Sequence, residues 1–486
     1  MKTIASQRTV GLLIPLLLGI FLAATTGFDL LPQVGLFNGK RILEVFMLLA
    51  LFGATALNPA LRLALAELLG FLPRWIGFAL GFAALAGTIS ALRFPHPGYG
   101  LLEIAMLAML VSGLLATAAA RQVCGNNFDR MALLVLISIG VISSVTELTG
   151  IIVAWLLGFE FDFNKMLVRF FHPRFYNQLQ TFMIPLIATL PFIFGSSRKL
   201  KLIAIGLIGI QWCLVLVSGG RGTVVSLITA FTLAAILFPS NRRAWFRIHA
   251  AGLLAGVVIY LSLLAMNQSV VPGGEGFVSQ SIGRPMAHTS GRINLWSIAL
   301  DQATKQPLLG SGPSRYACGL DPNIAAHPHS FPMTVLSEMG FPAFTLLMLV
   351  CLWLGWQLLV RCRESQDGTL SSDTLIAMLG CSIMAATVHA MVSGVLIMPA
   401  SQVMTILIGG WMLGTLNIQP TESPVNNRSA VLVLTISFVV AAAVSVFSVS
   451  ELQKMNLRTS QERTKVLAEP RYWQMGRACN FTYDED

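Results

Sequence analysis

The sequence predicts an all-α, polytopic integral membrane protein with about 12 to 13 transmembrane helices and one large polar loop. Its composition supports this fold class, because 55 % of the 486 residues are hydrophobic and only 11 % are charged. Soluble domains carry about 25 % charged residues. The pattern supports it too: long apolar runs alternate with short basic loops, and only residues 267–330 interrupt the alternation with a long polar stretch.

A helix needs roughly 20 apolar residues to cross a bilayer, and about thirteen runs are candidates. In chain order they are 10–31, 40–57, 72–93, 101–119, 131–157, 178–195, 200–218, 222–238, 247–266, 331–360, 373–397, 401–416 and 429–449. The run 401–416 is short and the run 222–238 is barely long enough, so about twelve spans remain an alternative. No convincing cleavage site follows the first run, which we therefore expect to be retained as a helix.

The basic residues predict which loops face the cytoplasm. Lys and Arg close to span ends mark cytoplasmic loops, and they occur here in every second loop. With an odd number of spans, the outer side holds the loops 158–177 and 267–330 and the tail after 450. Lys40, Arg41 and the basic residues of the tail depart from the rule. The net charge of +10 therefore reflects topology, and it does not predict a nucleic-acid partner.

Four segments follow from this organisation. Residues 1–266 hold the N-terminal transmembrane helices, 267–330 the large loop, 331–449 the C-terminal transmembrane helices and 450–486 the tail. We expect the tail to lie on the same side of the membrane as the large loop.

The large loop contains one predicted helix. Ile293, Trp296, Leu300 and Ala303 recur at helical spacing, and Ser290 precedes them in the position of an N-cap. We expect this helix to lie in or near the membrane interface. Packing on a small core of the loop itself is the alternative.

Arginines on the outer face predict a site for an anionic lipid. Arg221 lies in the glycine-rich turn 218–222, and Arg292 lies in the first turn of the loop helix. A guanidinium can bind phosphate through two hydrogen bonds, and a helix N-terminus also favours anions. Arg284 is a weaker candidate of the same kind. An ordinary interfacial arginine is the alternative for each of them.

Histidines supply the candidates for proton transfer. His327 and His329 stand directly before a predicted span, and a neutral imidazole can accept a proton near neutral pH. The alternatives are two ordinary loop histidines or a metal site, although two histidines without a third ligand are a weak zinc signal. His389 lies inside the run 373–397. It is either a group facing the site or a partner in a helix–helix hydrogen bond.

Acidic and cysteine residues on the outer side leave two further questions open. Glu160 and Asp162 could hold Mg²⁺ or Mn²⁺, or they could be loop acids near basic neighbours. Cys318 and Cys479 are the two cysteines expected on the outer side, so a disulfide between them is permitted if that side is oxidising. Two free cysteines are the alternative.

Three segments together resemble the O-antigen ligase and O-antigen polymerase superfamily of bacterial inner-membrane glycosyltransferases. The first is Leu216-Val-Ser-Gly-Gly-Arg-Gly-Thr, similar to the family's Ser-x-Ser-Arg-Gly element. The second is Ser290-Gly-Arg-Ile-Asn-Leu-Trp with Pro307-Leu-Leu-Gly-Ser-Gly-Pro, similar to Arg-x-x-x-Trp and Pro-x-x-Gly-x-Gly in the family's periplasmic loop. The third is His329-Ser330 followed by Gly340, with Ala343 where the family usually has a second glycine.

The resemblance implies a metal-independent enzyme of the bacterial inner membrane, without a cofactor, whose active site faces the periplasm. It implies that His329 is the catalytic histidine, because its spacing to Gly340 matches, and that Arg221 and Arg292 are the two important arginines. The weaker candidates for substrate binding are His327, Arg284, Arg174 and His389. Arg174 belongs to the segment 171–177, which is similar to a periplasmic stretch of the family.

The partners that the resemblance implies are an undecaprenyl-pyrophosphate-linked glycan, an acceptor and membrane lipid. The acceptor can be lipid A core, as for an O-antigen ligase, a growing O-antigen, as for a polymerase, or a protein such as pilin, as for an O-oligosaccharyltransferase. A transporter or flippase for lipid-linked sugar is the alternative from another class. It would place its site near the bilayer midplane, whereas the charged residues here gather on the outer face. The sequence also has no G-x-x-x-x-G-K-[ST] motif for ATP-driven transport.

Overall fold

The structure is a computed structural model of the chain, and its regular secondary structure is helical throughout the part of the chain that it describes. That part comprises residues 2–31, 34–95, 97–159, 170, 172–239, 242–270, 291–318, 320, 324–364, 369–416, 427–462 and 471–473. The predicted all-α polytopic membrane fold is confirmed over these residues.

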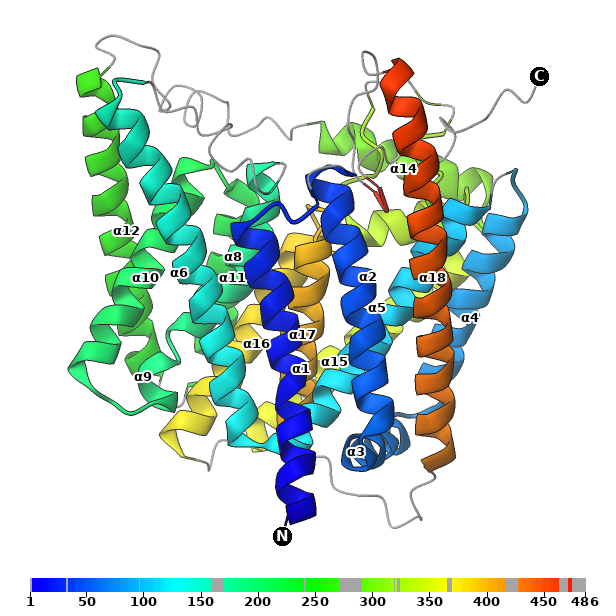
Figure 1. The fold of residues 1–486 in the computed structure, drawn as a ribbon, viewed down its shortest axis with the longest axis horizontal. Helices are drawn as coiled ribbons and strands as arrows, with labels where there is room; N and C mark the ends of the chain where they lie inside the picture. Colours follow the sequence, from blue (N-terminus) through cyan, green and yellow to red (C-terminus); the bar gives the residue numbers. More distant parts are fainter. Residues whose placement is uncertain are drawn as a thin grey trace.

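The helices form one bundle, shown in Figure 1. They are α1 (Lys2–Gly27), α2 (Leu36–Leu57), α3 (Pro59–Phe71), α4 (Arg74–Leu92), α5 (Gly98–Cys124), α6 (Asn126–Leu156), α8 (Pro173–Ile187), α9 (Leu190–Ile193), α10 (Arg198–Val217), α11 (Arg221–Leu237), α12 (Arg242–Val270), α14 (Arg292–Lys305), α15 (Phe331–Glu364), α16 (Leu370–Ala390), α17 (Pro399–Thr415) and α18 (Asn427–Glu462).

Twelve of the thirteen predicted apolar runs each overlap one helix, and the run 178–195 is divided between α8 and α9. Within the described residues, nine helices are long and apolar enough to cross a membrane, or ten if the bent pair α2–α3 is counted as one span. The helices α8, α11 and α17 are shorter, at 15, 17 and 17 residues. The start of α1 and the end of α18 lie at opposite ends of the bundle (Figure 1), as an odd number of crossings requires. We call the end where α14 lies the loop end.

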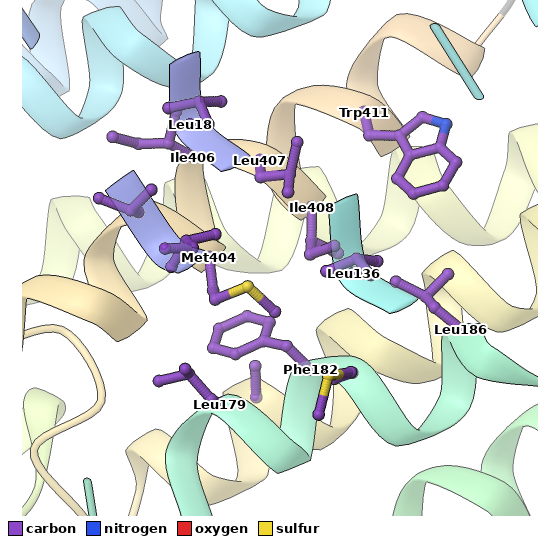
Figure 2. Packing of buried hydrophobic residues seen from close by; sticks show 14 of the residues in the cluster. Leu18, Leu136, Leu179, Phe182, Leu186, Met404, Ile406, Leu407, Ile408 and Trp411 are labelled. Atoms are coloured by element: carbon purple, nitrogen blue, oxygen red, sulfur yellow. The ribbon is translucent and has the colours of Figure 1, made fainter. Parts of the chain in front are cut away.

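The shortest predicted span, 401–416, forms the central helix α17. Figure 2 shows Met404, Ile406 and Leu407 of this helix packed among side chains of its neighbours, including Leu18 of α1 and Phe182 of α8. All three α17 side chains are 0 % exposed. A helix that is apolar on every side is a buried helix. Because protein surrounds α17, it does not need the full length of a lipid-facing span.

Residues 59–71 form a helix that the apolar pattern did not predict. Asn58 caps α3, since its side-chain oxygen accepts hydrogen bonds from Ala60 N at 2.9 Å and Leu61 N at 3.3 Å. Asn as N-cap followed by Pro59 is a strong start signal. The helix turns 97° away from α2 and packs against α5 and α18 at the end opposite the loop end.

The long helix α15 bends at Gly340, and the turn 307–312 completes its hydrogen bonding. Pro342 has no N–H, so it cannot donate to Glu338 O four residues earlier. Instead, Gly312 N donates to Glu338 O at 3.1 Å. The other two bonds between the segments are Ser311 N to Ser337 O at 2.7 Å and Phe341 N to Pro307 O at 2.8 Å. The turn 307–312, part of the second family-like segment, is therefore joined by main-chain bonds to the start of α15, which carries Gly340 of the third.

Two glycines of these motifs permit this close backbone approach. A Cβ at Gly310 would lie 2.4 Å from the carbonyl carbon of Glu338, and a Cβ at Gly340 would lie 2.6 Å from Pro307 O. Both glycines also have positive φ, at 63° and 78°, a conformation that glycine adopts at low cost. Neither can be replaced without separating the turn from α15.

Lys40 and Arg41, which depart from the positive-inside rule, are buried structural residues. They are 8 % and 1 % exposed. The Lys40 ammonium lies 4.6 Å from the centroid of the Phe170 ring. Arg41 forms an ion pair with Glu44 at 2.5 Å and donates to Tyr472 O at 3.1 Å. Since protein groups hold both cations, they do not report the orientation of the loop.

The disulfide question is answered in part. Cys318 is disulfide-bonded, whereas Cys124, Cys213, Cys351 and Cys381 are free. Cys479 lies outside the described residues, so its pairing with Cys318 stays a prediction.

We expect a membrane-impermeant maleimide to label Cys479 in intact spheroplasts only after reduction, because an outer-side disulfide would protect it. Lys305→Cys at the loop end and Lys199→Cys at the opposite end serve as the outer and inner controls, since both side chains are exposed. Labelling of Cys479 only in broken membranes would contradict both the disulfide and the outer tail. Labelling without reduction would contradict the disulfide alone.

Candidate functional site

The segment 327–330 holds two histidine side chains against each other. His329 has a left-handed backbone, with φ 51°, and its N–H donates to His327 Nδ1 at 3.1 Å. The two ring centroids are 4.2 Å apart. His327 is 4 % exposed, and its Nδ1 is already used as an acceptor. His329 is half-buried, so it is the histidine that a substrate can reach.

Helix α14 docks directly onto this segment. Trp296 Nε1 donates to Pro328 O, next to His329, at 3.1 Å. The Tyr316 hydroxyl donates to Leu295 O at 2.8 Å, and Gln302 Nε2 donates back to Tyr316 O at 2.7 Å. These bonds fix the helix that carries Arg292 relative to the histidines.

The first turn of α14 departs from the prediction. The helix begins at Arg292, and its N-cap is Gly291, with φ 75° and no side-chain hydrogen bond. The expectation that Ser290 caps the helix is therefore wrong, and Ser290 itself lies outside the described residues. A helix start that lacks a side-chain cap leaves its N–H groups available to an anion.

The buried face of α14 also differs from the predicted one. Leu295, Ala299 and Ala303 are buried, in a small core with Tyr316 and Ala317. The apolar side chains Ile293 and Leu300 are 63 % and 50 % exposed. The alternative of a small core within the loop is confirmed, and the two exposed side chains leave an apolar surface on the other face of the helix.

Positive charges surround His329. Partial burial and the charges of Arg174, Arg292 and His172 lower the pKa of His329 to about 4. Burial and Arg174 also lower the pKa of Arg292. His172 caps α8, since its Nδ1 accepts from Arg174 N at 3.1 Å. Groups that repel one another in this way are stabilised by a bound anion.

Arg221 begins α11 on the other side of the site. The preceding turn rests on α8, because the Ser218 hydroxyl donates to Asn177 Oδ1 at 2.9 Å. Gly220 contacts the same asparagine so closely that a Cβ there would lie 2.5 Å from Asn177 Nδ2. The Arg221 side chain is exposed. Position 219 needs glycine for its φ of 61°.

His389 lies between the two arginine-bearing helices. A Cβ at Gly222 of α11 would lie 3.2 Å from His389 Nε2, and His389 Nδ1 lies 2.8 Å from Thr181 Oγ1. Arg292 acts on His389 electrostatically. His389 therefore makes a helix–helix hydrogen bond, and it also lies beside Gly222 of α11 and within electrostatic range of Arg292, so neither of its two interpretations excludes the other.

The structure brings together most of the predicted site residues. His329, His327, Arg292, Arg174 and His389 are linked by the contacts and charges given above, and Arg221 joins them through α11. Arg284, Glu160 and Asp162 lie outside the described residues. Two further residues were not singled out from the sequence, His172 and Asn177. Both lie in the segment 171–177, so its resemblance was the signal that pointed to them.

No group of three His, Cys, Asp or Glu side chains that could hold a metal ion occurs among the described residues.

Residues 203–348 match a family model described as O-Antigen ligase. This segment of the chain is therefore similar to the O-antigen ligase family. The matched segment contains all three resembling motifs and both arginines of the site. No curated protein matches the chain. The predicted resemblance is confirmed over this segment, and it supports an O-antigen ligase-like function of a multi-pass membrane protein in general terms.

Proposed function

We propose that the protein transfers a glycan from undecaprenyl pyrophosphate to an acceptor hydroxyl on the periplasmic face of the bacterial inner membrane. The observation that carries this proposal is the placement of Arg174 and Arg292 around a neutral His329 at the loop end. Arginines that repel each other suit a pyrophosphate, and a neutral imidazole suits proton abstraction.

The reaction follows from these roles. The acceptor oxygen bonds to the anomeric carbon C1 of the donor glycan, and its proton passes to His329. The bond between C1 and the pyrophosphate oxygen breaks, and that oxygen keeps the electron pair. Arg292 and Arg221 stabilise the negative charge that develops on the leaving pyrophosphate. The proton leaves His329 to solvent or to the released pyrophosphate.

Donor binding prepares His329 for this step. In the free protein, burial and, after it, the charges of Arg174 and Arg292 lower the pKa of His329 to about 4. A pyrophosphate bound between them offsets their charge and raises the pKa of His329 towards its ordinary value. The imidazole becomes a stronger base when the donor is present.

An apolar cavity next to the cationic site suits the lipid part of the donor. It has about 310 Å³ of open space and is lined by Leu36, Phe37, Lys40, Phe170, Phe175, Met398, Pro399 and Ala400. Phe175 lies in α8 one residue after Arg174, and its ring is 6.0 Å from that of His172. Its apolar lining offers a surface on which the first isoprenoid carbons could pack, close to the site of the pyrophosphate.

The pH dependence should separate the free protein from the donor complex. Transfer needs neutral His329, so the rate falls as the pH drops through its pKa. We expect kcat/KM for the donor, which reports the free protein, to hold until the pH approaches about 4. The acid limb of kcat should lie at higher pH, because the bound pyrophosphate raises the pKa of His329. Coincident acid limbs in the two profiles would contradict this coupling.

The proposed function is tested with purified protein in detergent, a lipid-linked glycan and separate acceptors. We expect transfer to lipid A core, as for a ligase, at an unchanged rate in EDTA, because cationic side chains replace a metal on the pyrophosphate. Transfer to a second glycan or to pilin instead would identify the polymerase or O-oligosaccharyltransferase reaction. Activity that is lost in EDTA and restored by Mn²⁺ would direct attention to Glu160 and Asp162. A flippase would form none of these products.

A further inference from the structure

The short segment 471–473 of the tail is buried at the loop end of the bundle. Arg471, Tyr472 and Trp473 are 2 %, 2 % and 1 % exposed. The backbone of this segment is held by Arg41, which donates to Tyr472 O at 3.1 Å and to Arg471 O at 3.4 Å. The Tyr472 hydroxyl lies 2.8 Å from Ser448 Oγ of α18. These three residues of the tail are thus anchored on α2 and α18.

Arg471 connects this segment to two acidic side chains on different helices. Its Nη2 lies 2.8 Å from Glu338 Oε2 on α15, and its Nε lies 3.2 Å from Glu103 Oε1 on α5. The side chain of Arg471 is 2 % exposed, and that of Glu338 is 4 % exposed. Because a buried carboxylate needs a paired cation, the position of Glu338 depends on Arg471.

Glu338 in turn holds the loop that supports α14. Its Oε2 accepts from Ser314 N at 3.1 Å, and its Oε1 accepts from Tyr316 N at 3.3 Å. Ser314 has a left-handed backbone, with φ 63°, a conformation that a serine adopts only when its surroundings hold it there. The two bonds from Glu338 provide that restraint.

The last links lead to the proposed catalytic groups. Tyr316 fixes α14 through Leu295 O, at 2.8 Å, and α14 carries Arg292 in its first turn. From the same helix, Trp296 donates to the carbonyl of Pro328, directly before His329. We propose that Arg471 is a positioning residue, which acts through Glu338 and Tyr316 to set Arg292 and His329 in register for glycan transfer. This inference rests on the proposed function.

The test compares Arg471→Gln, Glu338→Gln, their double variant and Tyr472→Phe. Arg471→Gln leaves the buried Glu338 and the partly buried Glu103 without their cation. Glu338→Gln leaves one acceptor oxygen where Ser314 N and Tyr316 N need two. Tyr472→Phe is the matched control, since it removes the contact with Ser448 and keeps the ring. Arg471→Lys keeps a cation between Glu103 and Glu338 and should restore most of the lost activity.

Two readouts are expected to change together. Hydrogen exchange in residues 312–316 and 292–305 should rise about tenfold in both glutamine variants, and not in Tyr472→Phe. The value of kcat/KM should fall about 30- to 100-fold, since small misplacement of reacting groups has effects of that size. The double variant should be within about threefold of the worse single variant, because both changes break the same connection.

The outcomes separate the two proposals. Glu338→Gln with normal exchange and normal kinetics overturns the positioning role, even if Arg471→Gln does not accumulate as folded protein. The positioning role is also overturned if the double variant loses activity by the product of the two single losses. Two residues that contribute independently to the fold would give that result. If the wild-type protein transfers no glycan, the proposed function fails, and hydrogen exchange alone still decides whether Arg471 fixes the loop.

Discussion

His329→Ala is expected to lower the rate of glycan transfer about 10²- to 10⁴-fold, the range for loss of a general base. His329 is the histidine that a substrate can reach, because His327 is buried and uses its Nδ1 to hold the His329 backbone. Burial and the charges of Arg174 and Arg292 lower the pKa of His329, which favours the neutral imidazole in the free protein. The measurement is the initial rate with a saturating lipid-linked donor, for protein that elutes as a single folded species in detergent.

The left-handed backbone of His329 requires a second variant. Asn, Asp and His adopt a φ of 51° more readily than alanine does, so a loss of activity in His329→Ala could come from a displaced loop. Asparagine tolerates this conformation better than other side chains, and it is no base at neutral pH. We expect His329→Asn to be as inactive as His329→Ala. Normal transfer by folded His329→Asn would remove this residue from the catalytic role.

Arg292→Ala is expected to lower kcat about 10²- to 10³-fold, the size of effect seen when one group that stabilises developing charge is removed. Arg221→Ala should act in the same way from the start of α11. Arg292→Lys keeps a charge but loses the planar fork that can bind pyrophosphate through two hydrogen bonds, so we expect an intermediate rate. Initial rates at saturating donor measure all three variants.

A second signature distinguishes Arg292 from a residue that only supports the fold. Its charge lowers the pKa of His329, so in Arg292→Ala the acid limb of kcat/KM should move to higher pH. Lys305→Ala is the matched control, because Lys305 ends the same helix and its side chain is 71 % exposed. A wild-type kcat for Arg292→Ala, with an unmoved acid limb, would show that Arg292 does not contact the leaving group.

The site was predicted unevenly for a physical reason. The motifs marked Arg221, Arg292 and His329 because the chemistry of a pyrophosphate requires cations and a base. His172 and Asn177 had no such signature. Asn177 supports a turn through Ser218, which lies far away in the chain. His172 caps α8 through the nearby Arg174 N, but its link to the site is its effect on the distant His329. Local sequence does not show which of many polar side chains has such a neighbour.

The sequence alone determined the helical membrane fold and its order of helices. In hydrocarbon each backbone polar group must be bonded within the chain, so a long apolar run has few choices other than a helix. Even the short run 401–416 was found as α17. The helix α3 was not, because its signal is the cap at Asn58 rather than an apolar run of spanning length.

Only the tertiary structure decided how charged residues are used. Lys40, Arg41 and Arg471 had the same appearance in the sequence as basic residues that set topology, yet they are buried. Arg471 is paired with Glu103 and Glu338, which lie 368 and 133 positions earlier in the chain. Such pairings depend on which helices pack together at the loop end. Packing is a property of the whole bundle, and no local pattern records it.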